Sequence, residues 1–335
     1  MTGPAMAQRT ATTQAPWAFA APFGARGFVT DLDGPVHWVE FGTGQEGPGQ
    51  DGPPLVFVHG LGGSHLNWCL IGSQLAGDRR AVALDLHGFG LTPGARYTST
   101  VQRNARLLDL FVREITGTPV ILVGNSMGGL ISLLQTAAAP DTVQGLVLID
   151  PALPMPRQAP DRQVASRFLL YALPGAGELY FSAILSRQPP ELAVQRVIDL
   201  CFADPARADP AMLTASIALA RQRQATPHRD QAFLAASRSL MRAVGQRRRY
   251  WEMMASVRVP VLLIGGEADR LVPVASIRQA SARNPGWETV VLAGVGHTPQ
   301  LEAPDVVIGA VRDWLGRHFP RPQAEEGLNA ATHRT

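Results

Sequence analysis

The chain of 335 residues contains no lysine, so all thirty of its basic side chains are arginine. It has only two cysteines, Cys69 and Cys201, which lie far apart in the sequence. This spacing excludes a disulfide framework and offers no metal-ligand pattern. No apolar run approaches the ~20 residues that a membrane-spanning helix needs. We therefore expect no stable membrane insertion.

The first 27 residues lack a basic segment followed by an apolar run, so they do not resemble a secretory signal. We interpret residues 1–27 as a flexible N-terminal arm and expect a cytoplasmic protein. The net charge is only +3, and the excess of positive charge lies in residues 151–256, which hold 14 Arg against 8 Asp and Glu. This segment has neither interleaved aromatic residues nor a glycine-rich phosphate loop. It favours solvated helix faces over nucleic-acid binding.

Short apolar runs bounded by Gly, Pro or Asp alternate with helical patterns along most of the chain. The alternation predicts an α/β fold with a mostly parallel sheet covered by helices on both faces. Residues 28–33 could add an antiparallel hairpin strand, because Asp33 and Gly34 supply a turn. The seven strands are expected at residues 36–41, 55–59, 81–86, 120–124, 146–149, 261–264 and 289–292.

The alternation stops after Asp150, and the strand pattern resumes at residues 259–261. Between them the apolar residues recur at helical spacing, which predicts a helical cap over residues 151–256 inserted into a core of residues 28–150 and 257–319. A last helix is expected from Pro304 to His318, with a disordered tail at residues 320–335. The apolar cap residues that could line a substrate pocket are Phe168, Tyr171, Tyr180, Phe181 and Met241.

Ser126 lies in the sequence Gly124-Asn-Ser-Met-Gly128, between a predicted strand and a predicted helix. A turn tight enough to project this serine from the sheet leaves no room for side chains at the two glycines. The turn also brings the Met127 amide to a helix N-terminus, where it could stabilise an oxyanion. Ser126 is therefore the candidate nucleophile.

A serine hydroxyl needs a base, and His297 follows the last strand on a glycine-rich loop. His65 and His87 are secondary candidates, while His59 is interpreted as a structural residue. Asp269, on the loop after the preceding strand, is the candidate carboxylate that orients the base. Two other acids remain open for that role, Glu267 and Asp150.

A second oxyanion donor is expected from the loop that follows His59. The Leu61 amide is the first candidate and the Gly62 amide the next, because glycines let the backbone approach a substrate closely. This chemistry needs no metal and no organic cofactor.

These motifs, together with Asp85-Leu-His-Gly-Phe-Gly and Gly296-His-Thr-Pro-Gln-Leu-Glu, resemble the α/β-hydrolase superfamily and its cap-bearing esterase and lipase branch. Related epoxide hydrolases and haloalkane dehalogenases use an aspartate nucleophile. Ser126 at that position therefore argues against both of these activities. The resemblance implies a serine hydrolase that cleaves carboxylic esters of an apolar acyl or aromatic substrate through an acyl-enzyme. The alternative is cleavage of a C–C bond in diketone ring-cleavage products, since Gly124-Asn-Ser-Met-Gly-Gly is similar to the corresponding sequence of the hydrolases that act on them. A non-catalytic ligand-binding role is a further possibility. The oligomeric state stays open.

Overall fold

The computed structural model describes residues 12–15, 19–42, 52–77, 79–94, 99–155, 166, 170–185 and 187–320. Within this part of the chain one sheet of nine strands forms the centre, in the order β1-β2-β3-β5-β4-β6-β7-β8-β9. The strands are β1 (Thr12–Gln14), β2 (Ala25–Asp31), β3 (Pro35–Phe41), β4 (Leu55–Val58), β5 (Ala81–Leu84), β6 (Val120–Asn125), β7 (Val143–Ile149), β8 (Val261–Gly266) and β9 (Glu288–Leu292).

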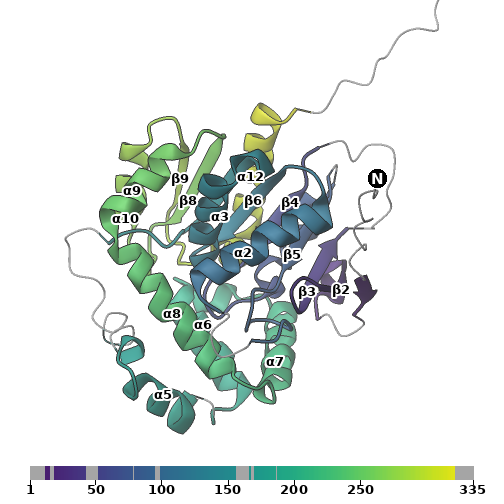
Figure 1. Ribbon diagram of the computed structural model, residues 1–335, viewed down its shortest axis with the longest axis vertical. Coiled ribbons are helices and arrows are strands. Elements are labelled where there is room, and N and C mark those ends of the chain that lie inside the picture. The colour runs from purple at the N-terminus through teal and green to yellow at the C-terminus, as the bar shows by residue number, and fades with distance from the viewer. Residues whose placement is uncertain are drawn as a thin grey trace, which may run out of the picture.

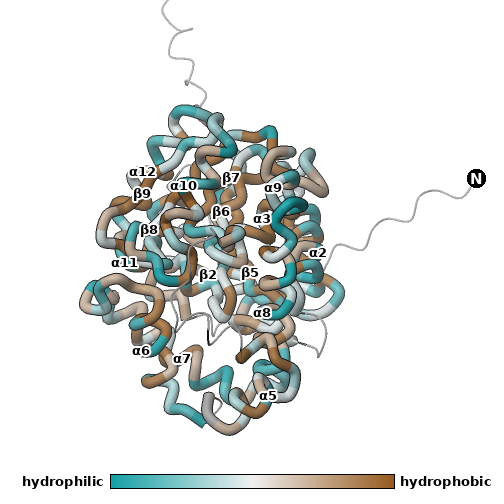
Figure 2. The backbone as a smooth tube through the Cα atoms, turned by 90° about the vertical axis from the view of Figure 1, so that its left-hand side faces the viewer, coloured by the Kyte–Doolittle hydropathy of each residue, from teal (hydrophilic) through white to brown (hydrophobic). Residues whose placement is uncertain are grey.

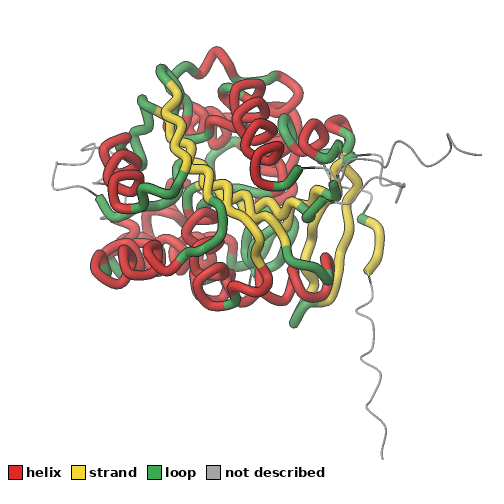
Figure 3. Tube along the Cα trace, turned by 90° about the horizontal axis from the view of Figure 1, so that it is seen from above, coloured by secondary structure: helices red, strands yellow, loops and turns green. Residues whose placement is uncertain are grey.

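The strands from β5 through β4, β6, β7 and β8 to β9 pair in parallel, while β1, β2 and β3 pair antiparallel at one edge. Figure 3 shows the sheet as a twisted band with helices on both sides. Alternate residues of β6 belong to opposite cores: Leu122 packs on one face, and Ile121 and Val123 on the other. Burial on both faces is why these strands read as continuous apolar runs rather than alternating ones.

The hairpin expected before Val36 is confirmed. β2 pairs with β3 from Ala25↔Phe41 to Asp31↔Pro35, and the turn uses positive φ angles of 59° at Asp33 and 122° at Gly34. The prediction of a wholly flexible arm over residues 1–27 is wrong for Thr12–Gln14, which pairs with β2 as strand β1, and for residues 25–27, since β2 begins at Ala25. Its polar Thr and Gln residues gave no apolar signal, because an edge strand can be stabilised by main-chain hydrogen bonds alone.

Helices cover both faces of the sheet (Figure 1). Those on the first face are α2 (Val101–Phe111), α3 (Met127–Ala138), α9 (Arg247–Ser256) and α10 (Val274–Arg283). Those on the second face are α1 (Gly72–Leu75), α11 (Pro299–Glu302) and α12 (Pro304–His318). The final helix therefore has the bounds that the sequence predicted, beginning with a proline at its first position, where no intrahelical N–H is needed.

The inserted segment is helical in its described part and lies below the carboxyl ends of the strands in Figure 1. Its helices are α5 (Ala176–Tyr180), α6 (Pro190–Cys201), α7 (Pro210–Gln224) and α8 (Arg229–Gly245). α9, which the sequence assigned to the same lobe, instead packs its Tyr250 and Met254 into the first core, and the Tyr250 hydroxyl donates to the Ala152 carbonyl at 2.6 Å. We accordingly place the end of the covering lobe before α9. Phe168 and residues 321–335 of the expected tail lie outside the described residues.

Figure 2 colours the chain by hydropathy, and both apolar and polar residues occur along α6, α7 and α8. Such mixed helices bury one face and expose the other. None of the helices in the described residues is both long enough and apolar enough to pass through a membrane.

Candidate active site

Ser126 stands between the last residue of β6 and the first residue of α3, at the carboxyl edge of the sheet. Its backbone has φ 54° and ψ −118°, a conformation that non-glycine residues rarely adopt. Three main-chain hydrogen bonds hold this strained residue: Ser126 N donates to Ile149 O at 3.1 Å, and Ser126 O accepts from the amides of Leu130 at 3.2 Å and Ala152 at 2.9 Å. Strain of this kind persists only where the surroundings over-determine the geometry.

Two glycines make that turn possible, as the motif requires. A Cβ atom at Gly128 would lie 2.0 Å from the carbonyl oxygen of Val58 on β4. One at Gly124 would lie 2.7 Å from the carbonyl oxygen of Gly128. Both distances are far inside van der Waals contact, so larger residues would push the helix away from the sheet. The first amides of α3, including that of Met127, have no acceptor within the helix and are available to an anion.

His297 and Asp269 are brought together by the loops after β9 and β8. Nδ1 of His297 lies 2.6 Å from Oδ2 of Asp269, and both side chains are buried. The other oxygen of Asp269 accepts the amides of Leu271 at 2.7 Å and Val272 at 3.0 Å. Because an ionised carboxylate only accepts hydrogen bonds, Nδ1 of His297 carries the hydrogen and Nε2 is left as the basic nitrogen.

The rival candidates are bonded to other groups. Glu267 is exposed, 4.0 Å from Arg278. His65 is fully buried and bonded to Asp85, and the main-chain amide of His87 is held by Asn104. Asp150 is fully buried, and its oxygens accept the amide of Gly266 at 3.0 Å. Of the three carboxylates considered for the base, Asp269 is the one bonded to His297.

The loop after β4 forms a tight turn in which Gly63 N donates to Gly60 O at 3.1 Å and Gly62 has φ 77°. That turn does not use the Leu61 amide. His59 holds the loop from below: its Nδ1 donates to Gly60 O at 2.8 Å, and its Nε2 accepts the Leu86 amide at 3.0 Å. Burial lowers the pKa of His59 to about 4, so its ring is neutral at physiological pH. This is the structural role that the sequence predicted.

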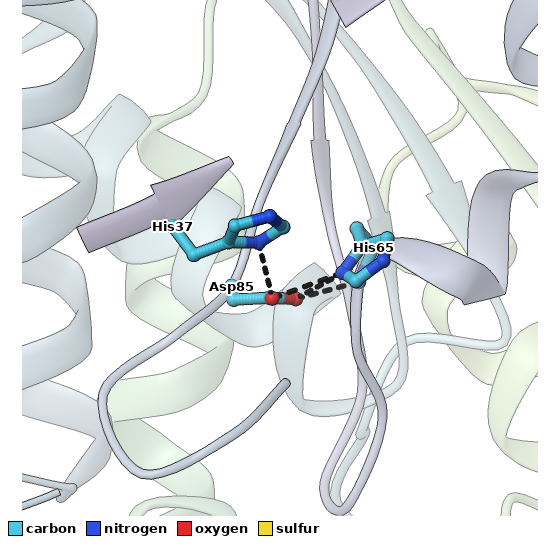
Figure 4. A group of neighbouring side chains, drawn as sticks. All are labelled: His37, His65 and Asp85. Carbon is cyan, nitrogen blue, oxygen red and sulfur yellow. Dashed lines mark hydrogen bonds and ion pairs between the residues drawn. The ribbon is translucent and has the colours of Figure 1, made fainter. Parts of the chain in front are cut away.

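Asp85, the first residue of the Asp85-Leu-His-Gly-Phe-Gly motif, supports the same loop through two histidines (Figure 4). Its carboxylate accepts Nδ1 of His37 at 2.8 Å, Nδ1 of His65 at 2.9 Å and the amide of Leu91 at 2.8 Å. Burial opposes ionisation of Asp85, but the two histidines outweigh it and hold its pKa well below the usual value. A Cβ at Gly90 would lie 1.9 Å from the Asp85 carboxyl carbon. The carboxylate of Asp85 thus connects three segments by hydrogen bonds: β3, the start of η2 (His65–Trp68) and the loop after β5.

Two further residues fix the position of the His297 loop. Nδ2 of Asn125 donates to Ile149 O at 3.0 Å and to His297 O at 3.1 Å. The buried carboxylate of Glu302 accepts the amides of Gly296 at 2.7 Å and Ala203 at 3.0 Å. Both residues stood inside motifs already quoted from the sequence, but nothing in the sequence alone distinguished them from their neighbours.

The inserted lobe contacts this loop directly. His297 N donates to the carbonyl of Cys201, at the end of α6, at 2.6 Å. A Cβ at Gly296 would lie 2.3 Å from that same carbonyl oxygen. Burial raises the pKa of the Cys201 thiol to about 12, so it is not a thiolate nucleophile. The lobe and the His297 loop are therefore joined by a direct main-chain hydrogen bond.

A cavity of about 740 Å³ lies between the core and the inserted lobe, and Ser126, His297 and Leu61 line it. Its volume is within the range of small-molecule sites. Four of the five apolar lobe residues expected to face the substrate also line it: Tyr171, Tyr180, Phe181 and Met241. Most of the remaining lining is also aliphatic or aromatic, with few charged side chains.

Comparison with known proteins agrees with the fold. A model of the Alpha/beta hydrolase family matches residues 55–310, so the chain belongs to that family. It is 29% identical over 311 residues to the dihydrolipoyllysine-residue acetyltransferase component of the acetoin cleaving system of Pseudomonas putida, covering 90% of this chain and 75% of that protein. It is 27% identical over 260 residues to Lipase 1 of Psychrobacter immobilis, covering 76% of this chain and 74% of that protein.

Among solved structures, a haloalkane dehalogenase from Agrobacterium tumefaciens matches with a TM-score of 0.73 at 22% sequence identity, covering 88% of this chain and 97% of that one. At that identity the likeness is one of fold. The protein is thus an α/β hydrolase, and its lipase and esterase relatives support ester hydrolysis in general terms.

Proposed function

We propose that the protein hydrolyses carboxylic esters through an acyl-enzyme on Ser126. The observation that carries the proposal is that Ser126 and His297 line one cavity while His297 is bonded to Asp269 at 2.6 Å. A serine becomes a nucleophile only when a positioned base accepts its proton, and a carboxylate on the far ring nitrogen stabilises the resulting imidazolium.

In this mechanism Nε2 of His297 takes the Ser126 proton as Oγ attacks the ester carbonyl. The oxyanion that forms is stabilised by the amides of Met127 and Leu61. The C–O bond to the alcohol then breaks, and His297 gives its proton to the leaving oxygen. Water attacks the acyl-enzyme with the same base, which releases the acid and restores Ser126. Loss of one oxyanion donor is expected to lower turnover ~10²- to 10³-fold.

The lining of the cavity indicates an apolar substrate. Phe233 lies close to the oxyanion loop, since a Cβ at Gly62 would be 3.3 Å from its ring. Around it, Tyr171 and Phe181 pack with ring centroids 5.6 Å and 5.1 Å from that of Phe233. An acyl chain or aromatic acid entering beside the oxyanion amides would contact these rings. Burial of apolar surface would then contribute ~25 cal/mol per Å².

The test is a panel of p-nitrophenyl esters from acetate to dodecanoate, with Ser126→Ala and the matched exposed control Ser256→Ala. We expect turnover that rises with acyl length, is lost in Ser126→Ala and is kept in Ser256→Ala. A fluorophosphonate should label Ser126, as peptide mass spectrometry would show.

The other outcomes discriminate between the alternatives. Cleavage of a vinylogous diketone without ester turnover would assign the site to C–C bond hydrolysis. Neither turnover nor labelling of Ser126 would contradict an enzymatic role and indicate a binding protein.

A further inference from the structure

The polar side chain of Asn67 lies beside the oxyanion loop, at the wall of a mostly apolar cavity. Its Oδ1 accepts the Ser64 amide at 2.9 Å, while the Ser64 hydroxyl accepts the Leu66 amide at 3.2 Å. These bonds cap the N-terminus of η2 and hold the asparagine in place. A Cβ at Gly63 would lie 2.6 Å from that Oδ1, so the side-chain amide packs against the loop that carries Leu61.

The cap determines which end of the Asn67 amide is left over. Because a main-chain N–H can only donate, the Asn67 atom that meets Ser64 N is the oxygen and not the nitrogen. The nitrogen, Nδ2, carries two N–H groups, and no residue in the described part of the chain accepts a hydrogen bond from them. Nδ2 is not one of the polar atoms that are sealed in the interior without a partner, so solvent reaches it. Asn67 therefore presents an unused donor at the cavity.

A second polar group that the described residues leave without a partner lies on the neighbouring element. Thr298 directly follows His297 and precedes α11, which packs against η2. Its side chain is 6% exposed, and its hydroxyl oxygen has no hydrogen-bond partner among the residues that the structure describes. Thr298 lines the same cavity as Asn67. Buried polar groups are nearly always hydrogen-bonded, so an exception at a cavity wall indicates a ligand atom.

The two groups stand next to the place where the alcohol must leave. In the proposed mechanism His297 gives its proton to the leaving oxygen, so the alcohol part of the ester must lie next to this residue. Thr298 is its chain neighbour, and η2 and α11 pack together on the core side of the cavity. The rings of Phe181 and Phe233, which would contact the acyl part, belong to the lobe on the other side. Polar recognition is therefore expected for the alcohol.

We propose that Asn67 is a specificity-determining residue, whose Nδ2 donates a hydrogen bond to a second oxygen in the alcohol part of the ester. The Thr298 hydroxyl is the other partner of that oxygen. The substrate class is then an ester of a diol or of a glycol ether, rather than of a simple alkanol. This inference rests on the proposed function, because it takes His297 to protonate the leaving alcohol.

The test compares methoxyethyl octanoate with butyl octanoate, in which a methylene group replaces the ether oxygen. Asn67→Asp keeps the cap, because a carboxylate oxygen still accepts the Ser64 amide, but it replaces the donor by an acceptor. The ratio of kcat/KM for the ether ester to that for the butyl ester should fall roughly 3- to 10-fold in Asn67→Asp, the effect of one hydrogen bond. Comparing ratios removes the intrinsic reactivity of the two esters. An unchanged ratio would overturn the inference.

A second pair of esters separates recognition from a structural effect. Hydroxyethyl octanoate and propyl octanoate differ by a hydroxyl in place of a methyl group, and a hydroxyl can donate to the new carboxylate as well as accept. The ratio for this pair should therefore stay within about 2-fold in Asn67→Asp. Thr298→Val, which keeps the shape of the side chain but lacks the hydroxyl, should lower the ratios of both pairs. Equal loss of both ratios in Asn67→Asp would mean a disturbed cavity and would contradict the proposal.

The control for the added charge is Gln222→Glu. Gln222 is exposed on α7 and does not line the cavity. This variant carries the same extra negative charge as Asn67→Asp, and it should leave the ratios of both pairs of esters unchanged. A fall of either ratio in Gln222→Glu would attribute the effect to net charge and would contradict the assignment of Asn67.

Binding can be measured without ester cleavage. Ketone analogues of the methoxyethyl and butyl esters, with a methylene group in place of the ester oxygen, cannot be hydrolysed, and Ser126→Ala prevents their addition to the nucleophile. Isothermal titration calorimetry of this variant should give a Kd roughly 3- to 10-fold lower for the methoxy ketone than for its alkyl counterpart, and adding Asn67→Asp should remove the difference.

The two possible failures are then distinguishable. Equal Kd values for the two ketones in Ser126→Ala would overturn the inference, whether or not the native protein cleaves esters. A difference in Kd without turnover of any ester would refute the proposed function alone and would support recognition of the second oxygen by Asn67.

Discussion

The side-chain amide of Asn125 donates to the main-chain carbonyl of His297 at 3.1 Å, joining the residue before the candidate nucleophile to the candidate base. The same amide donates to Ile149 O at 3.0 Å. One buried side chain thus ties together β6, β7 and the loop after β9. The relative position of Ser126 and His297 therefore depends on the Asn125 hydrogen bonds as well as on the sheet.

Asn125→Ala should lower kcat more than it raises KM. The His297 carbonyl would lose its donor, and displacement of a reacting group by about 1 Å can cost ~10²-fold in rate. Steady-state kinetics on the best p-nitrophenyl ester would measure the effect. Asn104→Ala is the matched control, because Asn104 is an equally buried asparagine of α2 that does not line the cavity. Equal loss of kcat in both variants would attribute the effect to general destabilisation.

Asp269→Asn should lower kcat by ~10⁴-fold, the cost of the corresponding change in serine proteases. The amide would present either a donor or a weaker acceptor to Nδ1 of His297, which disturbs the tautomer and removes the charge that stabilises the imidazolium. Asp305→Asn, at an exposed position of α12, is the control and should be fully active. If Asp269→Asn retained native kcat, the acid would have to be reassigned.

Glu302→Gln should weaken the hydrogen bonds that connect the His297 loop to the inserted lobe. The glutamine can accept from Ala203 and Asp204 with its oxygen, but it offers no acceptor to Gly296 N, which Glu302 binds at 2.7 Å. A buried amide without a partner costs ~1–3 kcal/mol of unfolding free energy. Urea unfolding would measure this loss, with a fall in kcat beside it. Glu288→Gln is the control, at a half-buried carboxylate that pairs with Arg317 and His318 on the surface and does not line the cavity, and it should change neither.

The parts of this architecture that the sequence predicted are those with a local signal. The buried strands are continuous apolar runs, and Gly124 and Gly128 mark the turn at Ser126 because sterics admit nothing larger there. Strand β1 was missed, because an edge strand of Thr and Gln residues carries no apolar pattern. The supports of the site were missed for a different reason.

Asn125, Asp85 and Glu302 act by contacts between residues far apart in the chain, 172 positions in the case of Asn125 and His297. Periodicity reports which face of an element is buried, and it says nothing of which buried polar group meets which. The sequence placed Asp269 ahead of Asp150 and Glu267, and the tertiary structure shows Asp269 to be the one of the three bonded to His297.

The stability that His59 contributes should depend on pH. Its pKa is about 4 in the folded protein because of burial, and about 6.5 in an unfolded chain. Between these values the unfolded state binds a proton that the folded state does not, so the contribution is complete above pH 6.5 and is lost as the pH falls toward 4. Asp150, whose pKa is raised, contributes with the opposite sign over part of this range.

The effect of His59 is therefore measured as a difference between the native protein and His59→Gln, which cannot titrate. The stability difference between the two should shrink by about 2 kcal/mol from pH 7.5 to pH 5. Urea unfolding followed by circular dichroism at both pH values would measure it. A difference that is the same at both would mean that His59 binds its proton equally well in the folded and the unfolded protein. The Leu86 amide that Nε2 of His59 accepts argues against that, because a protonated Nε2 cannot accept it.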